Sequence, residues 1–207
     1  MTYPDSIRRR LSWWRVAGVR RYLPSLLLLG LSELPLSSMP DASMPVTLFA
    51  FDQAAEPEWI VVNDGVMGGR SAGFVRVEEG TLRFTGTLVT QGGGFTSVRA
   101  PLRVDLTGQL GLELRVRGSG RRFELEVGDD VRAYGRNISR RASFPSSDEW
   151  TLVRVPFSAL GSSIFGRTVD APPIDLTRIS SVGLYMADGQ DGPFRLEVDF
   201  IRTYGAD

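Results

Sequence analysis

The side chains that could do chemistry in this sequence gather around two glycine-rich stretches. Asp64 stands in W-I-V-V-N-D-G-V-M-G-G-R-S, residues 59–71, and Arg99 ends G-G-G-F-T-S-V-R, residues 92–99. The Asp64 carboxylate could hydrogen-bond a ligand or, beside backbone carbonyls, coordinate a hard cation. An Asp in a turn can instead accept hydrogen bonds from its own main chain two residues on. A buried arginine needs a carboxylate partner, so we expect Asp64 and Arg99 to pair and to lock the two stretches together.

Glycines and large aromatic residues complete this candidate site. Gly68 and Gly69 are consecutive, which indicates either a positive φ or a second backbone that passes close by. Trp59 and Trp150 could stack on sugar rings, although large aromatic side chains beside strand ends more often fill a core. The residues expected to form the binding or structural site are Trp59, Asn63, Asp64, Gly65, Met67, Gly68, Gly69, Ser71, Gly93, Gly94, Phe95, Arg99 and Trp150.

Missing residue types exclude most catalytic and metal chemistry. The chain has no Cys and no His, and all 24 of its basic residues are arginine. It therefore lacks disulfides, a Ser-His-Asp triad, the usual zinc ligands, a Schiff-base lysine and the lysine of a P-loop. Asp188 and Asp191 flank glycines in a loop that could bind Ca²⁺, but two acids without further oxygen ligands make a weak site. We expect no enzyme, no metal site and no cofactor.

Length and charge indicate one domain preceded by a leader. A chain of 207 residues is one domain in length and can bury about 70% of its unfolded surface. Residues 1–44 hold six Arg and three acids, whereas residues 45–207 hold 18 Arg and 21 acids, a balance of about −3. A mildly acidic domain offers no electrostatic basis for binding nucleic acid. We expect a single folded domain over residues 45–207.

The leader itself leaves several interpretations open. Arginines alternate with large apolar residues up to Arg21, and the apolar run from Leu26 to Leu31 is far too short to cross a bilayer. Such a segment fits an organellar transit peptide or an interfacial amphipathic segment, and less well a secretory signal. Translation could instead start at Met39 or Met44. We expect a cytoplasmic protein, with export, an organelle or membrane contact through residues 1–38 as the alternative.

Period-2 alternation of apolar and polar residues predicts an all-β fold after Pro45. Residues 74–78 and 81–88 form an expected hairpin with its turn at Glu79-Gly80. Residues 112–117 and 123–127 alternate in the same way, and a hairpin between them would pair Arg115 with Glu124. That register also puts Glu113 opposite Glu126, which is unfavourable, so these strands could lie further apart.

The remaining pattern gives the number of strands. Alternation in the last strand puts Phe194, Leu196, Val198 and Phe200 on one face. Residues 161–173 are expected to form a long exposed loop, and Asp129-Asp130 a solvated turn. About ten strands separated by turn signals, each with one buried face, indicate an antiparallel β-sandwich or jelly roll.

Four ordered motifs resemble the complex I intermediate-associated protein 30 family. They are N-D-G-V-M-G-G-x-S at residues 63–71, G-G-F-x-S-V-R at 93–99, W-x-x-V-x-V-P-F at 150–157 and D-G-x-x-G-P-F at 188–194. The resemblance covers roughly residues 49–201. It implies a β-sandwich similar to galactose-binding domains, and a role in assembling respiratory NADH:ubiquinone oxidoreductase.

Two classes of function follow from this resemblance. The first is a non-catalytic, chaperone-like assembly factor that binds a protein partner, such as a subunit of the respiratory complex. The second is a carbohydrate- or small-ligand-binding module, since the implied fold is galactose-binding-like. Exposed aromatic residues gathered on a concave face would favour a sugar, whereas a flat apolar patch would favour a protein.

Overall fold

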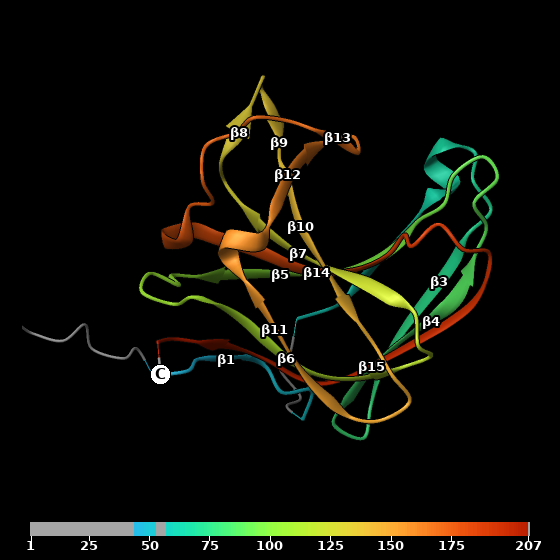
Figure 1. Ribbon diagram of the computed structural model, residues 1–207, viewed down its shortest axis with the longest axis horizontal. Coiled ribbons are helices and arrows are strands. Elements are labelled where there is room, and N and C mark those ends of the chain that lie inside the picture. The colour runs from blue at the N-terminus through green and yellow to red at the C-terminus, as the bar shows by residue number, and fades with distance from the viewer. Residues whose placement is uncertain (1–43, 53–56, 207) are drawn as a thin grey trace, which may run out of the picture. The chain divides into compact units, whose positions relative to one another are not determined.

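The computed structural model describes residues 44–52 and 57–206, which form a sandwich of two antiparallel sheets (Figure 1). The six-stranded sheet runs in the order β11 (Thr151–Pro156), β6 (Gly111–Gly118), β15 (Gly192–Tyr204), β4 (Thr81–Leu88) and β3 (Ala72–Glu78), with β1 (Thr47–Phe49) paired to β15. The seven-stranded sheet runs β13 (Arg167–Thr168), β12 (Gly161–Ile164), β10 (Ser139–Pro145), β7 (Arg122–Asp129), β14 (Ile179–Met186), β5 (Thr96–Val104) and β2 (Ile60–Asn63).

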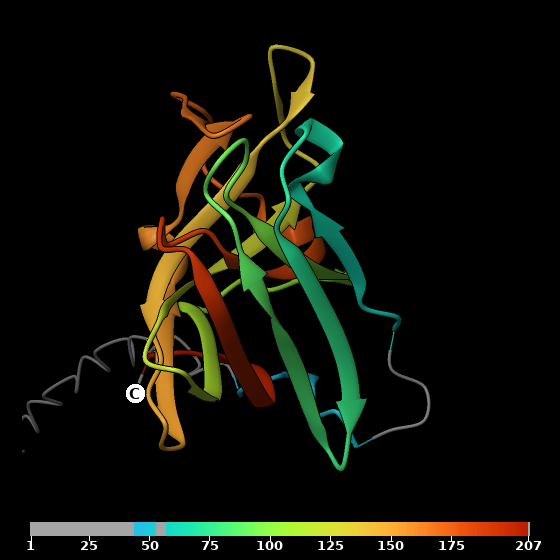
Figure 2. The same ribbon diagram turned by 90° about the vertical axis from the view of Figure 1, so that its right-hand side faces the viewer.

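Smaller elements complete the fold. A two-stranded sheet pairs β8 (Arg132–Ala133) with β9 (Arg136–Asn137), and three short 3₁₀ helices are η1 (Asp64–Met67), η2 (Phe157–Ala159) and η3 (Leu176–Arg178). In both ribbon views η1, the β8–β9 hairpin and the β12–β13 hairpin lie at the same end of the sandwich (Figure 2). The expected antiparallel β-sandwich is confirmed.

The core lies between the two sheets and is built from alternate residues of each strand. Leu82 and Phe84 of β4 are fully buried, as the alternation in that strand predicts. Phe84 packs edge-on against Phe194 of its own sheet, with ring centroids 4.9 Å apart, and at 6.4 Å against Phe123 of the facing sheet. Each such buried side chain stabilises the fold by about 1.5–3 kcal/mol, so these rings join the two sheets.

The expected hairpin between residues 112–117 and 123–127 is wrong. β6 pairs with β11 and β15, whereas β7 pairs with β10 and β14, so the chain crosses from one sheet to the other between them. The two glutamates that would have faced each other in that hairpin instead lie beside different arginines. Glu113 binds Arg154 and Arg202, and Glu126 lies beside Arg141 and Arg99. The like-charge conflict in the hairpin register is thereby removed.

Two further expectations fail for local reasons. β15 shifts register between Val198 and Phe200, so Ile201 rather than Phe200 enters the core. An extra residue in a strand moves every later side chain to the other face. The segment 161–173 contains β12 and β13 instead of being one long loop.

Asp129 also departs from its expected place in a solvated turn. Its carboxylate lies 3.2 Å from the Nε of Arg140 and accepts a hydrogen bond from the Asp175 N–H at 2.8 Å. This buried pair ties β7 and β10 to the segment before η3. By contrast, the hairpin at Glu79-Gly80 is confirmed.

The expected leader over residues 1–44 lies outside the described residues, apart from Met44. Among residues 44–52 and 57–206, no helix is long and apolar enough to cross a membrane.

Candidate functional site

Asp64 joins the two glycine-rich stretches through four hydrogen bonds. Its fully buried carboxylate accepts from the Ser71 N–H at 2.9 Å and from the Ser71 hydroxyl at 2.6 Å. From the second stretch it accepts the Gly94 N–H at 2.7 Å and the Phe95 N–H at 3.3 Å. We call this arrangement of residues 63–71 and 93–95 the clasp. The expected pairing of Asp64 with Arg99 is wrong, because backbone and hydroxyl donors occupy the carboxylate.

The clasp holds Asp64 in its charged form. Burial alone would raise the carboxyl pKa, but the hydrogen bonds from Ser71, Gly94 and Phe95 outweigh burial and lower the pKa below its ordinary value. With its oxygens used by protein donors, Asp64 is poorly placed to bind a cation. No group of three or more His, Cys, Asp or Glu side chains suited to a metal ion occurs in the described part of the chain.

Two glycines leave room for this carboxylate. A Cβ on Gly69 would lie 2.5 Å from Asp64 Oδ2, and a Cβ on Gly93 would lie 2.6 Å from Asp64 Cγ. Both distances are far inside van der Waals contact. Gly68 ends η1 at a φ of 87°. Of the consecutive glycines, Gly68 therefore supplies the left-handed turn, and Gly69 the close approach.

A second polar tie holds the same loops. The Asn63 side-chain oxygen accepts from the Gly73 N–H at 3.0 Å and from the Thr96 hydroxyl at 2.6 Å. Asn63 and Asp64 together fix the ends of β2, β3 and β5. The clasp thus fixes the positions of η1 and of the segment that leads into β5.

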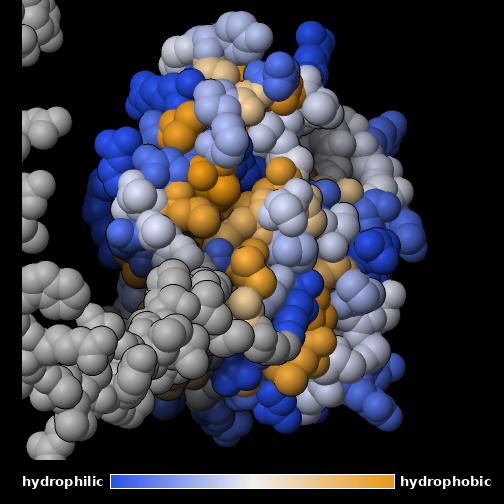
Figure 3. All heavy atoms as spheres, turned by 60° about the vertical axis from the view of Figure 1, so that its left-hand side comes forward, coloured by the Kyte–Doolittle hydropathy of each residue, from blue (hydrophilic) through white to orange (hydrophobic). Residues whose placement is uncertain are grey.

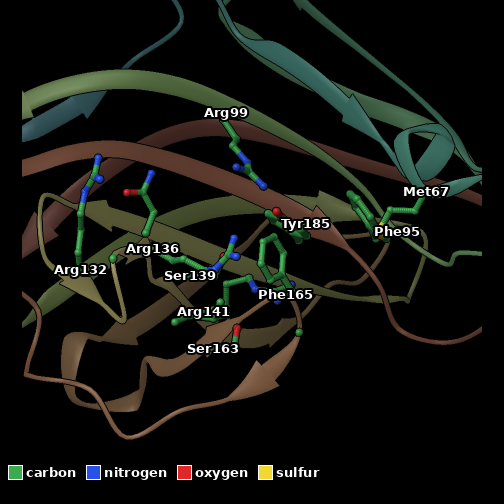
Figure 4. Close-up of a pocket in the computed structure, with 14 residues that line it drawn as sticks. Met67, Phe95, Arg99, Arg132, Arg136, Ser139, Arg141, Ser163, Phe165 and Tyr185 are labelled. Atoms are coloured by element: carbon green, nitrogen blue, oxygen red, sulfur yellow. The ribbon is translucent and has the colours of Figure 1, made fainter.

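An open pocket of about 750 Å³ lies beside the clasp, on the outer face of the seven-stranded sheet. Met67 from η1 and Phe95 from the second glycine stretch line the same side of it (Figure 4). Arg99, four residues further along the chain, also lines it. Three of the expected site residues, Met67, Phe95 and Arg99, therefore line one cavity. Asp64, which fixes the loops that carry Met67 and Phe95, does not itself line the cavity.

The other expected residues have different positions. Asn63, Asp64, Gly65, Gly68, Gly69, Ser71, Gly93 and Gly94 belong to the clasp. Trp59 is buried in the core against Phe49, with ring centroids 5.1 Å apart. Trp150 lies in contact with Arg115 and Arg117 of β6, in the six-stranded sheet. The two tryptophans therefore do not form one surface with the pocket.

Tyr185 of β14 is the centre of the pocket floor. The guanidinium of Arg99 lies 5.0 Å from its ring centroid, and that of Arg141 lies 4.6 Å away. The Phe95 ring stacks on Tyr185 at 6.0 Å. Only 6% of Tyr185 is exposed, because these neighbours cover it. Sequence reasoning missed Tyr185 and Arg141, which lie more than 40 residues beyond the end of the second glycine motif at Arg99.

Two glutamates beneath the floor balance its arginines. Glu126 lies 3.5 Å from Arg99 Nε and 3.8 Å from Arg141 Nε, and Glu124 accepts a hydrogen bond from Arg141 at 2.9 Å. Ser139 donates to Glu126 at 2.9 Å. The floor is therefore a network of matched charges around one aromatic ring.

Two hairpin tips form the rim, and sequence reasoning missed both. The β8–β9 turn is Tyr134-Gly135 with φ values of 52° and 72°, and the β12–β13 turn is Phe165-Gly166 with values of 50° and 74°. Positive φ at both central residues is typical of a type I′ turn. The available signal was an aromatic-glycine dipeptide followed by an arginine.

The outer face of the six-stranded sheet has a different character. Glu113 lies between Arg154 and Arg202 with ion-pair distances of 2.7 and 2.5 Å, and Arg117 binds Glu197 at 2.5 Å. The guanidiniums hold the pKa of Glu113 below its ordinary value despite its burial. These charges satisfy one another.

Hydrophobic residues also gather near the middle of the face shown in Figure 3, bordered by hydrophilic ones. A gathered apolar patch of this kind can mark a contact surface for a protein. The pocket combines an exposed aromatic ring with exposed arginines and is therefore the better-defined candidate site.

Solved structures with similar folds include carbohydrate-binding modules. The family 11 module of a cellulosomal cellulase of Clostridium thermocellum matches with a TM-score of 0.59 and 16% identity, over 80% of this chain and 97% of that one. The family 11 module solved with a β-1,3-1,4-mixed-linked tetrasaccharide matches with a TM-score of 0.57 and 17% identity, over 78% and 96%. At such low identity the likeness shows the fold alone.

Similar curated proteins are named for complex I. The mouse "Complex I intermediate-associated protein 30, mitochondrial" is 31% identical over 170 residues, which are 71% of this chain and 52% of that protein. A probable Caenorhabditis elegans counterpart, also named mitochondrial, is 31% identical over 97 residues, 45% of this chain and 28% of that protein. The chain thus spans about half the length of the mouse relative. The expected cytoplasmic location is contradicted by these mitochondrial relatives, whereas the organellar alternative agrees with them.

The family model of complex I intermediate-associated protein 30 matches residues 49–198, nearly the whole described sandwich. Its span includes the clasp, the pocket and both rim hairpins. This chain belongs to the complex I intermediate-associated protein 30 family.

Proposed function

We propose that the chain is a non-catalytic assembly factor that binds a protein partner through the pocket and its rim. The partner is a subunit or intermediate of respiratory NADH:ubiquinone oxidoreductase. Family membership and the name of the mouse relative support the link to complex I. The absence of His, Cys and Lys from the sequence, together with the use of Asp64 and Glu126 in internal pairs, supports a non-catalytic role.

The observation that carries the proposal is the aromatic rim. Tyr134 and Phe165 are each 83% exposed, and each occupies the first central position of a type I′ turn. That position favours Asn, Asp or Gly, and a bulky side chain at positive φ is an outlier that costs about 1 kcal/mol or more. Neither ring contributes a core contact that would offset this cost. Phe165 lines the pocket, and Tyr134 is the chain neighbour of Gly135, which also lines it. Exposed rings in such places are typical of anchors for a partner.

The alternative of sugar binding has weaker support. A sugar ring stacks on an open aromatic face, but Tyr185 is covered by Arg99, Arg141 and Phe95. Phe165 is exposed, yet the Arg136 guanidinium lies 5.0 Å from its ring centroid. A protein partner can place a side chain between such groups without needing a flat platform.

Affinity capture tests the proposal. Tagged full-length chain is incubated with respiratory membranes of its host solubilised in mild detergent, and mass spectrometry identifies the retained proteins. The variant is Phe165→Ala, and the matched control is Phe74→Ala, since Phe74 is 63% exposed on edge strand β3 of the other sheet. Loss of a central aromatic anchor costs more than about 1 kcal/mol, about five-fold in affinity.

We expect the wild type and Phe74→Ala to retain complex I subunits, and Phe165→Ala to retain about five-fold less. No complex I subunit in any sample would overturn the assembly role. Equal retention by Phe165→Ala and the wild type would overturn the placing of the contact at the pocket.

A further inference from the structure

We infer that the pocket receives an acidic, extended segment of the protein partner, whose carboxylates bind Arg132 and Arg136. The inference rests on the proposed function and adds the chemistry of the segment that is bound. It depends on how charge is distributed over the pocket.

The rim arginines differ from all the arginines in the floor. Arg99 and Arg141 each lie beside a glutamate, whereas no ion pair to Arg132 or Arg136 occurs within residues 44–52 and 57–206. Arg132 stands on β8 and Arg136 on β9, both exposed and both lining the pocket. The pocket thus has four arginines, two in the floor and two on the rim. The charges of Glu124 and Glu126 balance two of them, which leaves an excess of two positive charges.

This local excess contrasts with the domain as a whole. Residues 45–207 hold 18 Arg and 21 acids, so the domain is negative overall. An acidic partner is repelled at long range except where arginines are concentrated. The outer face of the other sheet offers no such place, because its arginines lie against Glu113, Glu197 and Asp199.

Arg99 in the pocket floor is not fully hydrogen-bonded within the protein. The Arg99 Nε makes no hydrogen bond to any described residue, and its 3.5 Å approach to Glu126 is too long for one. The Nε itself is buried, but the Arg99 side chain is 37% exposed, so a carboxylate entering beside Tyr185 can meet the outer part of its guanidinium. Planar guanidiniums bind carboxylates through paired N–H groups, which favours Arg over Lys in such a place.

Shape favours a peptide segment over a membrane surface. The volume of about 750 Å³ is in the range of recesses that hold a drug-sized group. Tyr185 and Phe165 both line this recess, with Met67 and Phe95 at one edge (Figure 4). A lipid surface needs a protruding patch, whereas a segment with alternating acidic and apolar side chains matches arginines beside Met67 and Phe165.

The test uses a fluorescein-labelled peptide of alternating Glu and Leu and a counterpart with Gln in place of Glu. Fluorescence anisotropy measures their binding to the full chain. The double variant is Arg132→Gln with Arg136→Gln. The matched control is Arg76→Gln with Arg103→Gln, which removes the same charge from side chains 77% and 81% exposed outside the pocket. Melting curves confirm that each variant folds.

We expect the Glu peptide to bind the wild type and the control equally, and the pocket variant about 2- to 30-fold more weakly. The Gln peptide should bind roughly ten-fold more weakly than the Glu peptide. Raising NaCl from about 0.1 M to about 1 M, where the Debye length falls from about 10 Å to 3 Å, should remove most of the difference.

Equal loss in the pocket variant and the control would overturn the inference, as would equal binding of both peptides. Flotation with anionic phosphatidylserine vesicles that depends on Arg132 and Arg136, without peptide binding, would assign the site to a membrane instead. Capture of complex I subunits that is unaffected by the double variant would leave the proposed function standing and refute only the acidic segment. Peptide binding without such capture would refute the assembly role alone.

Discussion

Replacing Gly69 with alanine should destabilise the protein, because the new Cβ would enter the space that the Asp64 carboxylate fills. The ideal Cβ would lie 2.5 Å from Asp64 Oδ2. A free side chain could swing away at little cost. Asp64 cannot, since its oxygens accept hydrogen bonds from Ser71, Gly94 and Phe95.

The structure sets the size of the effect. A hydrogen bond to a buried charge contributes about 1.5–3 kcal/mol, and overpacking a filled site costs about 1–3 kcal/mol. One lost bond plus the overpacking cost gives about 2.5–6 kcal/mol, a large part of a typical stability of about 5–15 kcal/mol. At about 2–4 °C per kcal/mol for a domain of this size, the melting temperature should fall by at least about 5 °C.

Differential scanning calorimetry with a control in the same motif tests this prediction. Gly65 lies in η1 with no heavy atom within 4 Å of an added Cβ. Gly65→Ala should therefore be neutral or stabilising by up to about 1 kcal/mol. If Gly69→Ala melted within about 2 °C of Gly65→Ala, the clasp would not be the rigid unit described above.

Three shorter predictions follow from the clasp, the core and the pocket. Because the folded-state pKa of Asp64 lies below its unfolded value of about 3.9, its stabilisation is complete above that pH and is lost as the pH falls through the lowered pKa. The difference in unfolding free energy between the wild type and Asp64→Asn should thus be constant at neutral pH and shrink below about pH 4; an unchanged difference would be contrary to this. A chain shortened to begin at Met44 should keep its melting temperature, since the described core runs from Phe49 to Ile201, and a loss above about 4 °C would show that the leader packs on the domain. Calorimetry should detect no saturable binding of a β-1,3-1,4-mixed-linked tetrasaccharide, and binding abolished by Phe165→Ala would restore the sugar hypothesis.

The fold was predictable wherever alternation and turn chemistry agreed. The hairpin at Glu79-Gly80 shows both signals and forms as expected. Alternation alone misassigned β6 and β7, because it shows which side chains face inward but not which sheet a strand joins. The bulge before Phe200 also leaves no mark in the period-2 pattern.

The candidate site was predictable only in part. Spacing indicated that Asp64 and the glycines form one unit, but the partners of a carboxylate depend on which donors the folded loops bring within reach. The rim hairpins were not predicted because their strands have only two to four residues, too few to show an alternation of apolar and polar side chains. An aromatic residue at a left-handed turn position also runs against the preference for Asn or Gly.

Site-specific photo-crosslinking gives the most direct test of the claim that the pocket rim contacts a complex I partner. A benzoylphenylalanine residue replaces Phe165 in one protein and Phe74 in another, and each is irradiated in solubilised respiratory membranes of the host. We expect a complex I subunit to be crosslinked from position 165 and not from position 74, with the crosslink reduced by Gly69→Ala through loss of the clasp. Crosslinks to that subunit from position 74 alone would contradict the account.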